Sequence, residues 1–212
     1  MSDSPIPHGS IVVVRHGETD WNIGRRIQGR TEIPLNDTGR AQARAAAGIL
    51  RESGSWTRVI ASPLGRAAET ARIIAEGLGL PAPSLDDGVL ERDFGPAEGL
   101  LVADAAARWP GLDVPGAETL VELAERGAHA VSRHLQEAPG AVVVAHGALI
   151  RATLSRLSGQ AAPRILNGEA WVLSPHPDGP PTSAARLPGD TAAPLTRALV
   201  RRLGAPEMQH AI

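Results

Sequence analysis

The hydrophobic positions of the chain form two kinds of segment that alternate along the sequence. Short apolar runs at residues 11–14, 59–61 and 141–145 have the length and composition of strands buried on both faces of a parallel sheet. Longer segments carry apolar residues at helical spacing, and they predict helices at 40–52, 62–77, 101–109, 117–137 and 148–158. This alternation of strands and helices is typical of an α/β protein.

The last third of the chain predicts two further elements. Residues 164–173 resemble a β-hairpin with Asn167-Gly168 at its turn, and residues 191–203 fit an amphipathic helix. Two histidines, His129 and His134, fall within the helix predicted at 117–137. Nothing else in the sequence places them in a site, so we assign them to the surface or the flank of that helix.

Polar residues follow two of the predicted strands directly. Arg15-His16-Gly17 comes after the first apolar run, and His146-Gly147 comes after the run at 141–145. Ligands of open α/β sheets bind just beyond the carboxyl ends of the strands, so both histidines are expected at one edge of the sheet. An arginine fork, imidazoles and backbone N–H groups near glycine suit a phosphate group.

A third candidate, Arg66, lies in the helix that is predicted to follow the strand at 59–61. Ser62 is a suitable N-cap and Pro63 fits the first turn, which would place Arg66 at the positive end of the helix. A cation there opposes the helix dipole unless an anion lies nearby. Taken alone, Arg66 fits a surface arginine equally well, and a single histidine after a strand is most often structural.

Composition excludes several classes of protein. The chain has 212 residues, no cysteine and a net charge of −2. Disulfides and thiolate metal sites are therefore excluded, and the charge argues against a nucleic-acid partner. No apolar run approaches the roughly 18 residues of a membrane span, so no membrane partner is expected. All 21 basic residues are arginine, so richness in arginine is by itself weak support for phosphate binding.

The ends of the chain predict its organisation. Residues 1–9 lack the charged-then-apolar order of a signal peptide, which predicts a flexible N-terminal tail and a cytoplasmic protein. We expect a single domain over residues 10–205, with a short cap around 91–116, and a C-terminal tail at 206–212.

Four segments in order resemble the pattern of the histidine phosphatase superfamily, which includes the phosphoglycerate mutases. They are Val14-Arg15-His16-Gly17-Glu18-Thr19, Ser62-Pro63-Leu64-Gly65-Arg66-Ala67-Ala68-Glu69-Thr70-Ala71, Leu90-Glu91-Arg92-Asp93-Phe94-Gly95 and Val144-Ala145-His146-Gly147. The similarity extends from about residue 10 to about residue 173. It implies the phosphoglycerate mutase-like fold, a three-layer α/β/α sandwich with a mainly parallel central sheet.

The resemblance also implies roles for the residues at the strand ends. His16 would be the nucleophile that forms a phosphohistidine, which divides the reaction into two displacements. Arg15, Arg66 and His146 would bind the non-bridging phosphate oxygens as cations and offset the charge of the transition state. The same cations would keep His16 unprotonated near neutral pH.

Glu91 would be the general acid that protonates the leaving oxygen and later accepts a proton from water. Spacing alone leaves Asp93 and Glu98 as alternatives. No metal or organic cofactor is implied. Substrate-binding contacts are expected from Asn22, Gln28 and Gly147, and a wall of the substrate pocket, or ordinary core, from Trp21, Ile27, Phe94 and residues 100–109.

Three functions fit this pattern. Mutases of the family carry a longer insertion than residues 100–116, an asparagine where this chain has Ala148, and a basic pair with no clear match near 110–117. These differences favour water as the acceptor, which predicts a cofactor-independent phosphomonoesterase acting on a small phosphorylated metabolite. The alternatives are a phosphoglycerate mutase and a non-catalytic phosphate-binding module, although such modules usually lose the nucleophile or the acid. The resemblance and the predicted hairpin also suggest a homodimer.

Overall fold

The structure, a computed structural model, describes residues 6–176 and 198–206 of the chain. Within these residues the strands form one six-stranded sheet with the order β3-β2-β4-β1-β5-β6. The strands are β1 (Ile11–Arg15), β2 (Arg58–Ala61), β3 (Ser84–Leu85), β4 (Ala141–Ala145), β5 (Ala170–Pro175) and β6 (Ala198–Gly204). The helices are α1 (Asp20–Ile23), α2 (Asp37–Ser53), α3 (Gly65–Leu78), α4 (Val102–Arg108), α5 (Leu120–Glu137) and α6 (Gly147–Ser158), with single 3-10 turns at η1 (Asp87–Val89), η2 (Gly95–Ala97) and η3 (Pro110–Leu112).

The centre of the sheet is parallel, as the apolar runs predicted. Strand β4 pairs in parallel with β1 on one side and with β2 on the other, and β3 extends this half in parallel. The other half is antiparallel, because β5 runs against β1 and β6 runs against β5. Strand β1 therefore has a hydrogen-bonded neighbour on both sides, and the segment that follows it lies in the middle of the sheet.

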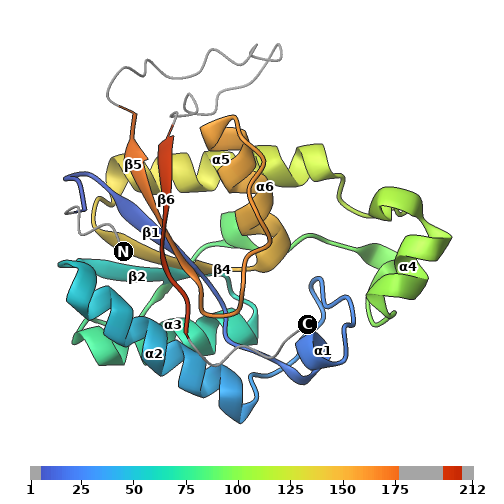
Figure 1. Ribbon diagram of the computed structural model, residues 1–212, viewed down its shortest axis with the longest axis horizontal. Helices are drawn as coiled ribbons and strands as arrows, with labels where there is room; N and C mark the ends of the chain where they lie inside the picture. The colour runs from blue at the N-terminus through green and yellow to red at the C-terminus, as the bar shows by residue number, and fades with distance from the viewer. Residues whose placement is uncertain (1–5, 177–197, 207–212) are drawn as a thin grey trace.

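Helices cover both faces of the sheet, which confirms the three-layer α/β/α sandwich (Figure 1). Alternation along β1 assigns its side chains to the two layers. Val12 and Val14 pack with the apolar residues of α2 and α3, whereas Ile11 and Val13 pack with those of α5 and α6. The four apolar side chains of β1 are at most 2% exposed.

Two sequence predictions at the end of the chain are wrong. Residues 164–166 form no strand, and the turn at Asn167-Gly168 leads from the loop after α6 into β5 instead of joining two hairpin strands. Gly168 has φ +70° and its N–H donates to the carbonyl of Arg15, so the turn is fixed by β1. The predicted helix at 191–203 is a strand over 198–204, and its first part, 191–197, lies outside the described residues.

Helix starts differ from the predictions by three residues in three places. Helix α2 begins at Asp37 and not at 40, because the Asn36 side chain caps it by accepting the N–H of Gly39. Helix α3 begins at Gly65, and Leu64 at its N-cap makes no side-chain cap, so Ser62 does not cap this helix. Helix α5 begins at Leu120 and not at 117, because the Thr119 side chain forms a capping box with Glu122.

The segment predicted as a cap, residues 91–116, forms a small unit beside the sheet. It contains η2, α4 and η3, and α4 lies apart from the two helical layers (Figure 1). Its buried apolar residues form a separate cluster with Ile27 of the loop after α1. We call this the cap cluster: Ile27, Phe94, Ala97, Ala105 and Val114. Among the described helices, none is long and apolar enough to span a membrane.

Candidate active site

His16 lies immediately after β1, and its backbone N–H donates to the carbonyl of Ala145 in the neighbouring strand. The ring nitrogen Nδ1 is 2.7 Å from the carbonyl oxygen of Gly17. A carbonyl can only accept, so Nδ1 carries the proton and Nε2 keeps its lone pair. Nε2 in turn accepts a hydrogen bond from Nε of Arg66, at 3.3 Å. Burial, followed by the charges of Arg66 and Arg15, lowers the pKa of His16 well below its ordinary value, so this histidine is neutral at pH 7.

The loop that carries His16 is fixed by a close approach of two backbones. A Cβ on Gly17 would come within 2.2 Å of the carbonyl oxygen of Gly39, at the first turn of α2. Only glycine permits this contact. The Gly17 N–H donates to the hydroxyl of Thr70 on α3, and the Glu18 N–H donates to the side chain of Gln42 on α2. The nucleophile candidate is therefore held by the helices of one layer as well as by the sheet.

Arg66 is fully buried, as its position in the first turn of α3 allows. Its terminal nitrogens donate to the carbonyls of Thr31 at 2.9 Å and Gly29 at 2.6 Å, which hold the guanidinium group beside His16. Burial lowers the pKa of Arg66 from its ordinary value.

Arg15 approaches the same point from β1. Its Nη1 donates to the carbonyl of Ile165, and its buried Nε has no hydrogen-bond partner among the described residues. Burial lowers the pKa of Arg15 to about 10, which leaves it charged at neutral pH. A buried guanidinium with an unpaired N–H is costly, and an anion bound beside it would offset that cost.

His146 lies directly after β4, and its ring centroid is 5.2 Å from that of His16. Nε2 of His146 is 2.8 Å from the hydroxyl of Ser62, whereas its buried Nδ1 has no partner among the described residues. Burial, together with the charge of Arg66, lowers the pKa of His146 well below its ordinary value. Burial therefore favours a neutral ring at this position, where the resemblance implies a cation. If Nε2 of a neutral His146 accepts a hydrogen bond from the Ser62 hydroxyl, the ring proton is on Nδ1. Nδ1 could then donate a hydrogen bond to a bound group, although the ring carries no charge.

The structure separates the three candidate acids. The carboxylate of Glu91 is buried and accepts the backbone N–H groups of Arg92 at 2.9 Å, Ala148 at 3.2 Å and Leu149 at 3.0 Å. The last two belong to the first turn of α6, whose N-terminus favours a negative charge. Of the three carboxylates, only Glu91 lines the cavity that contains His16.

Asp93 and Glu98 have other contacts. Asp93 accepts the N–H of Gly95 and lies 3.6 Å from Arg30, with its side chain 41% exposed. Glu98 accepts hydrogen bonds from the backbone N–H groups of Arg30 and Thr31, and these bonds connect the loop that contains both residues to the cap. Both have structural partners and neither lines the cavity.

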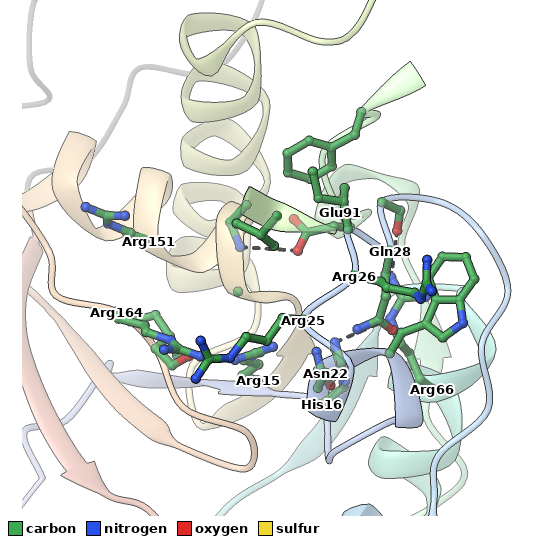
Figure 2. Close-up of a pocket in the computed structure, with 18 of the residues that line it drawn as sticks. Arg15, His16, Asn22, Arg25, Arg26, Gln28, Arg66, Glu91, Arg151 and Arg164 are labelled. Atoms are coloured by element: carbon green, nitrogen blue, oxygen red, sulfur yellow. Dashed lines mark hydrogen bonds between the residues drawn. The ribbon is translucent and has the colours of Figure 1, made fainter. Parts of the chain in front are cut away.

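The cavity beside His16 has a volume of about 570 Å³ (Figure 2). The expected binding residues Asn22, Gln28 and Gly147 all line it, whereas the more deeply buried His146 does not. The Oδ1 atom of Asn22 accepts hydrogen bonds from the backbone N–H of Thr19 and from the side-chain Nδ2 of Asn167. These bonds orient the side chain of Asn22 so that its own Nδ2 group is directed into the site. The expected apolar wall is also present, with the side chains of Trp21, Ile27, Phe94 and Val102.

Several residues that line the cavity were missed by the sequence reasoning. They are the arginines Arg25, Arg26, Arg151 and Arg164. The long polar loop at residues 24–30 gave a signal for the first two. The last two are isolated arginines in a chain whose basic residues are all arginine, so no pattern marked them.

The two histidines on α5 lie outside the cavity, as expected, but one is not at the surface. His129 is half-buried and its Nδ1 contacts the carbonyl of Glu125. His134 is buried, and its Nε2 lies 2.6 Å from a carboxylate oxygen of Asp86, which also contacts Arg133. Within the described ranges, no three histidine, aspartate or glutamate side chains come together as a metal site.

Comparison with known proteins identifies the family. The model of the histidine phosphatase superfamily (branch 1) matches residues 11–174. The chain is 43% identical over 152 residues to a protein named uncharacterized phosphatase PhoE from Bacillus subtilis, with 71% of this chain and 78% of the relative covered. It is 37% identical over 194 residues to phosphoglycerate mutase-like protein 4 of Arabidopsis thaliana, covering 79% and 84% of the two chains.

A solved structure agrees with this match. The mycobacterial glucosyl-3-phosphoglycerate phosphatase, solved with VO3, has a TM-score of 0.72 and 30% sequence identity, and the comparison covers 80% of this chain and 92% of that one. With the strand-end histidines, the buried arginines and the fold in agreement, the chain belongs to the histidine phosphatase superfamily, branch 1.

Proposed function

We propose that the chain hydrolyses phosphomonoesters of small metabolites through a phosphohistidine on Nε2 of His16. The observation that carries this proposal is the state of the His16 ring. Its Nδ1 proton is fixed on the Gly17 carbonyl, its Nε2 lone pair points toward Arg66, and its pKa is held low by burial and by neighbouring cations. Nε2 therefore keeps the lone pair with which an imidazole attacks phosphorus, and a bound phosphate would take over the hydrogen bond from Arg66 before the attack.

In the first step Nε2 of His16 forms a bond to phosphorus, and the bond from phosphorus to the ester oxygen breaks. Arg15 and Arg66 bind the non-bridging oxygens, and Nδ1 of the neutral His146 donates a hydrogen bond to them. Charge stabilisation of this kind accounts for most of what phosphoryl transfer requires. Glu91 must carry a proton in this step, and it gives that proton to the leaving oxygen, which departs as an alcohol.

In the second step a water molecule attacks the phosphohistidine, and Glu91 accepts a proton from that water. The bond from phosphorus to Nε2 breaks, which releases inorganic phosphate and restores neutral His16. Within Glu91, Oε1 accepts two hydrogen bonds and Oε2 accepts one, from Ala148. Oε2 is therefore the better placed oxygen to carry the transferred proton.

Hydrolysis is favoured over the mutase reaction by the small cap and by relatives and structures that are named phosphatases. A mutase must exclude water from its phosphohistidine, which requires a larger cover than residues 100–116 provide. The missing basic pair near residues 110–117 no longer supports this choice, because the cavity contains arginines from other segments.

The test is hydrolysis of p-nitrophenyl phosphate in the presence of EDTA. We expect wild type to release phosphate and His16→Ala to lose kcat/KM by about 10⁴-fold or more, as for removal of a covalent nucleophile. His129→Ala is the matched control, because His129 lies outside the cavity. Trapped phosphoenzyme should be present in wild type and absent in His16→Ala. Hydrolysis that survives His16→Ala would refute the proposal, and isomerisation of phosphoglycerate faster than its hydrolysis would favour the mutase.

The compartment and the assembly are further proposals. We propose a cytoplasmic protein and a homodimer, the latter as the family resemblance suggests. Light scattering with size-exclusion chromatography would test the dimer directly.

A further inference from the structure

The cavity carries more positive charge than one phosphate group requires. Among the described residues that line it there are six arginines and a single carboxylate, that of Glu91. Two of the six, Arg15 and Arg66, lie beside His16 and suffice for the phosphate that reacts. Arg26 is directed to the cap, since its Nη1 donates to the Gly99 carbonyl at 2.7 Å.

The other three, Arg25, Arg151 and Arg164, we call the rim arginines. They come from three separate segments: the loop after α1, the second turn of α6 and the loop before β5. Figure 2 shows them on the side of the cavity away from Arg66. All three are exposed, and within the described part of the chain none forms an ion pair.

Local geometry fixes two of the rim arginines. Arg151 is held through Nε, which donates to the carbonyl of Ala162, so its two terminal nitrogens remain for a ligand. Arg25 has φ +49°, a conformation uncommon for a residue with a side chain, and its carbonyl accepts the N–H of Val102 in the cap. Backbone strain of this kind is often found at ligand sites.

Placing these cations together opposes folding unless an anion binds. Arg164 is close enough to Arg15 to lower its pKa, in addition to the larger effect of burial. Several described arginines outside the cavity have carboxylate partners, as in the contacts between Arg126 and Glu118 and between Arg156 and Glu125. The rim arginines have no such partner among the described residues, although they line one cavity together.

We propose that the rim arginines bind a second anionic group of the substrate, a carboxylate or a second phosphate, while His16 reacts with the first phosphate. This inference rests on the proposed function and names its substrate class as phosphomonoesters that carry another acidic group. The guanidinium fork binds both kinds of anion through paired hydrogen bonds. A volume of about 570 Å³ accommodates a metabolite that reaches from His16 to the rim.

The experiment compares substrates that differ by one acidic group. For a carboxylate the pairs are phosphoserine with phosphoethanolamine and 3-phosphoglycerate with glycerol 3-phosphate. For a second phosphate the pair is fructose 1,6-bisphosphate with fructose 6-phosphate. We measure kcat/KM for wild type, Arg164→Gln, Arg151→Gln and the control Arg72→Gln, an exposed arginine of α3 paired with Glu76 outside the cavity.

Wild type should prefer the more acidic member of at least one pair by about 10- to 100-fold, the range for hydrogen bonds to charged groups. Arg164→Gln and Arg151→Gln should reduce that preference toward unity and change kcat/KM for the less acidic member by less than about threefold. Arg72→Gln should leave both values as in wild type. The pair that shows the preference identifies the second group as carboxylate or phosphate.

Three results would overturn the inference. They are equal kcat/KM for both members of every pair in wild type, a preference that persists in both rim variants, and an equal loss for both members. The last result would mean that the rim arginines only attract phosphate from solution.

Binding separates this inference from the proposed function. Calorimetry on His16→Ala, with and without Arg164→Gln, measures the affinity for 3-phosphoglycerate and for glycerol 3-phosphate without turnover. If hydrolysis fails but the acidic ligand binds more tightly through Arg164, the proposed function is wrong and the subsite stands. If hydrolysis depends on His16 but the affinities are equal, the carboxylate form of the subsite is wrong.

Discussion

Replacing Glu91 with glutamine tests the proposed acid with little disturbance of the fold. The carboxylate accepts two N–H groups on Oε1 and one on Oε2. A glutamine can place its carbonyl oxygen at the Oε1 position and keep the bonds from Arg92 and Leu149. It loses the bond from Ala148 and the negative charge at the N-terminus of α6. We expect the free energy of unfolding to fall by about 1 kcal/mol, so the variant should remain folded.

The catalytic effect should depend on the leaving group. An alkyl oxygen must be protonated as it departs, and loss of a general acid costs about 10²- to 10⁴-fold. The p-nitrophenolate ion is stable near neutral pH and departs without a proton. Glu91→Gln should therefore lower kcat/KM by about 10²-fold or more for an alkyl phosphate and by less than about tenfold for p-nitrophenyl phosphate.

The assay is kcat/KM for both substrates, because this ratio reports the steps up to phosphorylation of His16 and excludes the later hydrolysis. Asp93→Asn is the control, since Asp93 lies outside the cavity, and it should leave both values near those of wild type. Equal losses for the two substrates in Glu91→Gln would refute proton donation by Glu91. A loss confined to the alkyl phosphate in Asp93→Asn would assign the acid to Asp93.

Three further predictions concern the groups around the site and the fold. Ser62→Ala removes the hydroxyl that fixes the ring of His146, and we expect kcat/KM to fall by about tenfold from loss of one oriented donor, measured with p-nitrophenyl phosphate; no change would exclude this orienting role. The hydrogen bond from His134, together with other contacts, holds the pKa of Asp86 well below its ordinary value, so its stabilising effect is present at neutral pH and is lost as the pH falls below about 4. Asp86→Asn should therefore unfold with about 1 kcal/mol less free energy at pH 7, and the difference from wild type should shrink in acid; a constant difference in denaturant titrations would contradict this. Because burial lowers its pKa, His16 should not titrate between about pH 8 and about pH 6, and a ring shift in NMR spectra over that range would contradict the neutral nucleophile.

The sequence was most informative where one short segment contains both a strand and the candidate catalytic residues that directly follow it. The run that ends at Arg15 and His16 predicts a buried parallel strand, and its polar end then falls at the ligand edge of the sheet. The same holds for His146. Arg66 was placed in the first turn of its helix, although the contact that holds it beside His16 joins residues 50 positions apart.

Contacts between distant segments were beyond the reach of sequence reasoning. Ser62 looks like a helix cap, but its hydroxyl contacts a histidine 84 residues further along the chain. Arg151 and Arg164 can be recognised as site residues only in the structure, because α6 and the loop that follows it place both side chains beside the same cavity. The strand β6 was mistaken for a helix, since Val200 and Leu203 have the spacing of one helical face. In the strand they pack against opposite sides of the sheet, and pairing with β5 fixes this arrangement.

The separate packing of the cap cluster has a consequence for how this protein tolerates mutation. Side chains of the sheet core, such as Val14 and Val144, are fully buried, and each large-to-small change there costs about 2 kcal/mol or more of a total of about 5–15 kcal/mol. The cap cluster packs apart from that core, so changes at Phe94 or Val114 should reshape the mouth of the cavity before they unfold the sheet. A library of variants should therefore divide into core positions, where abundance falls first, and cap positions, where the spectrum of accepted substrates changes first. New specificities can arise in the cap while the chemistry beneath it stays the same.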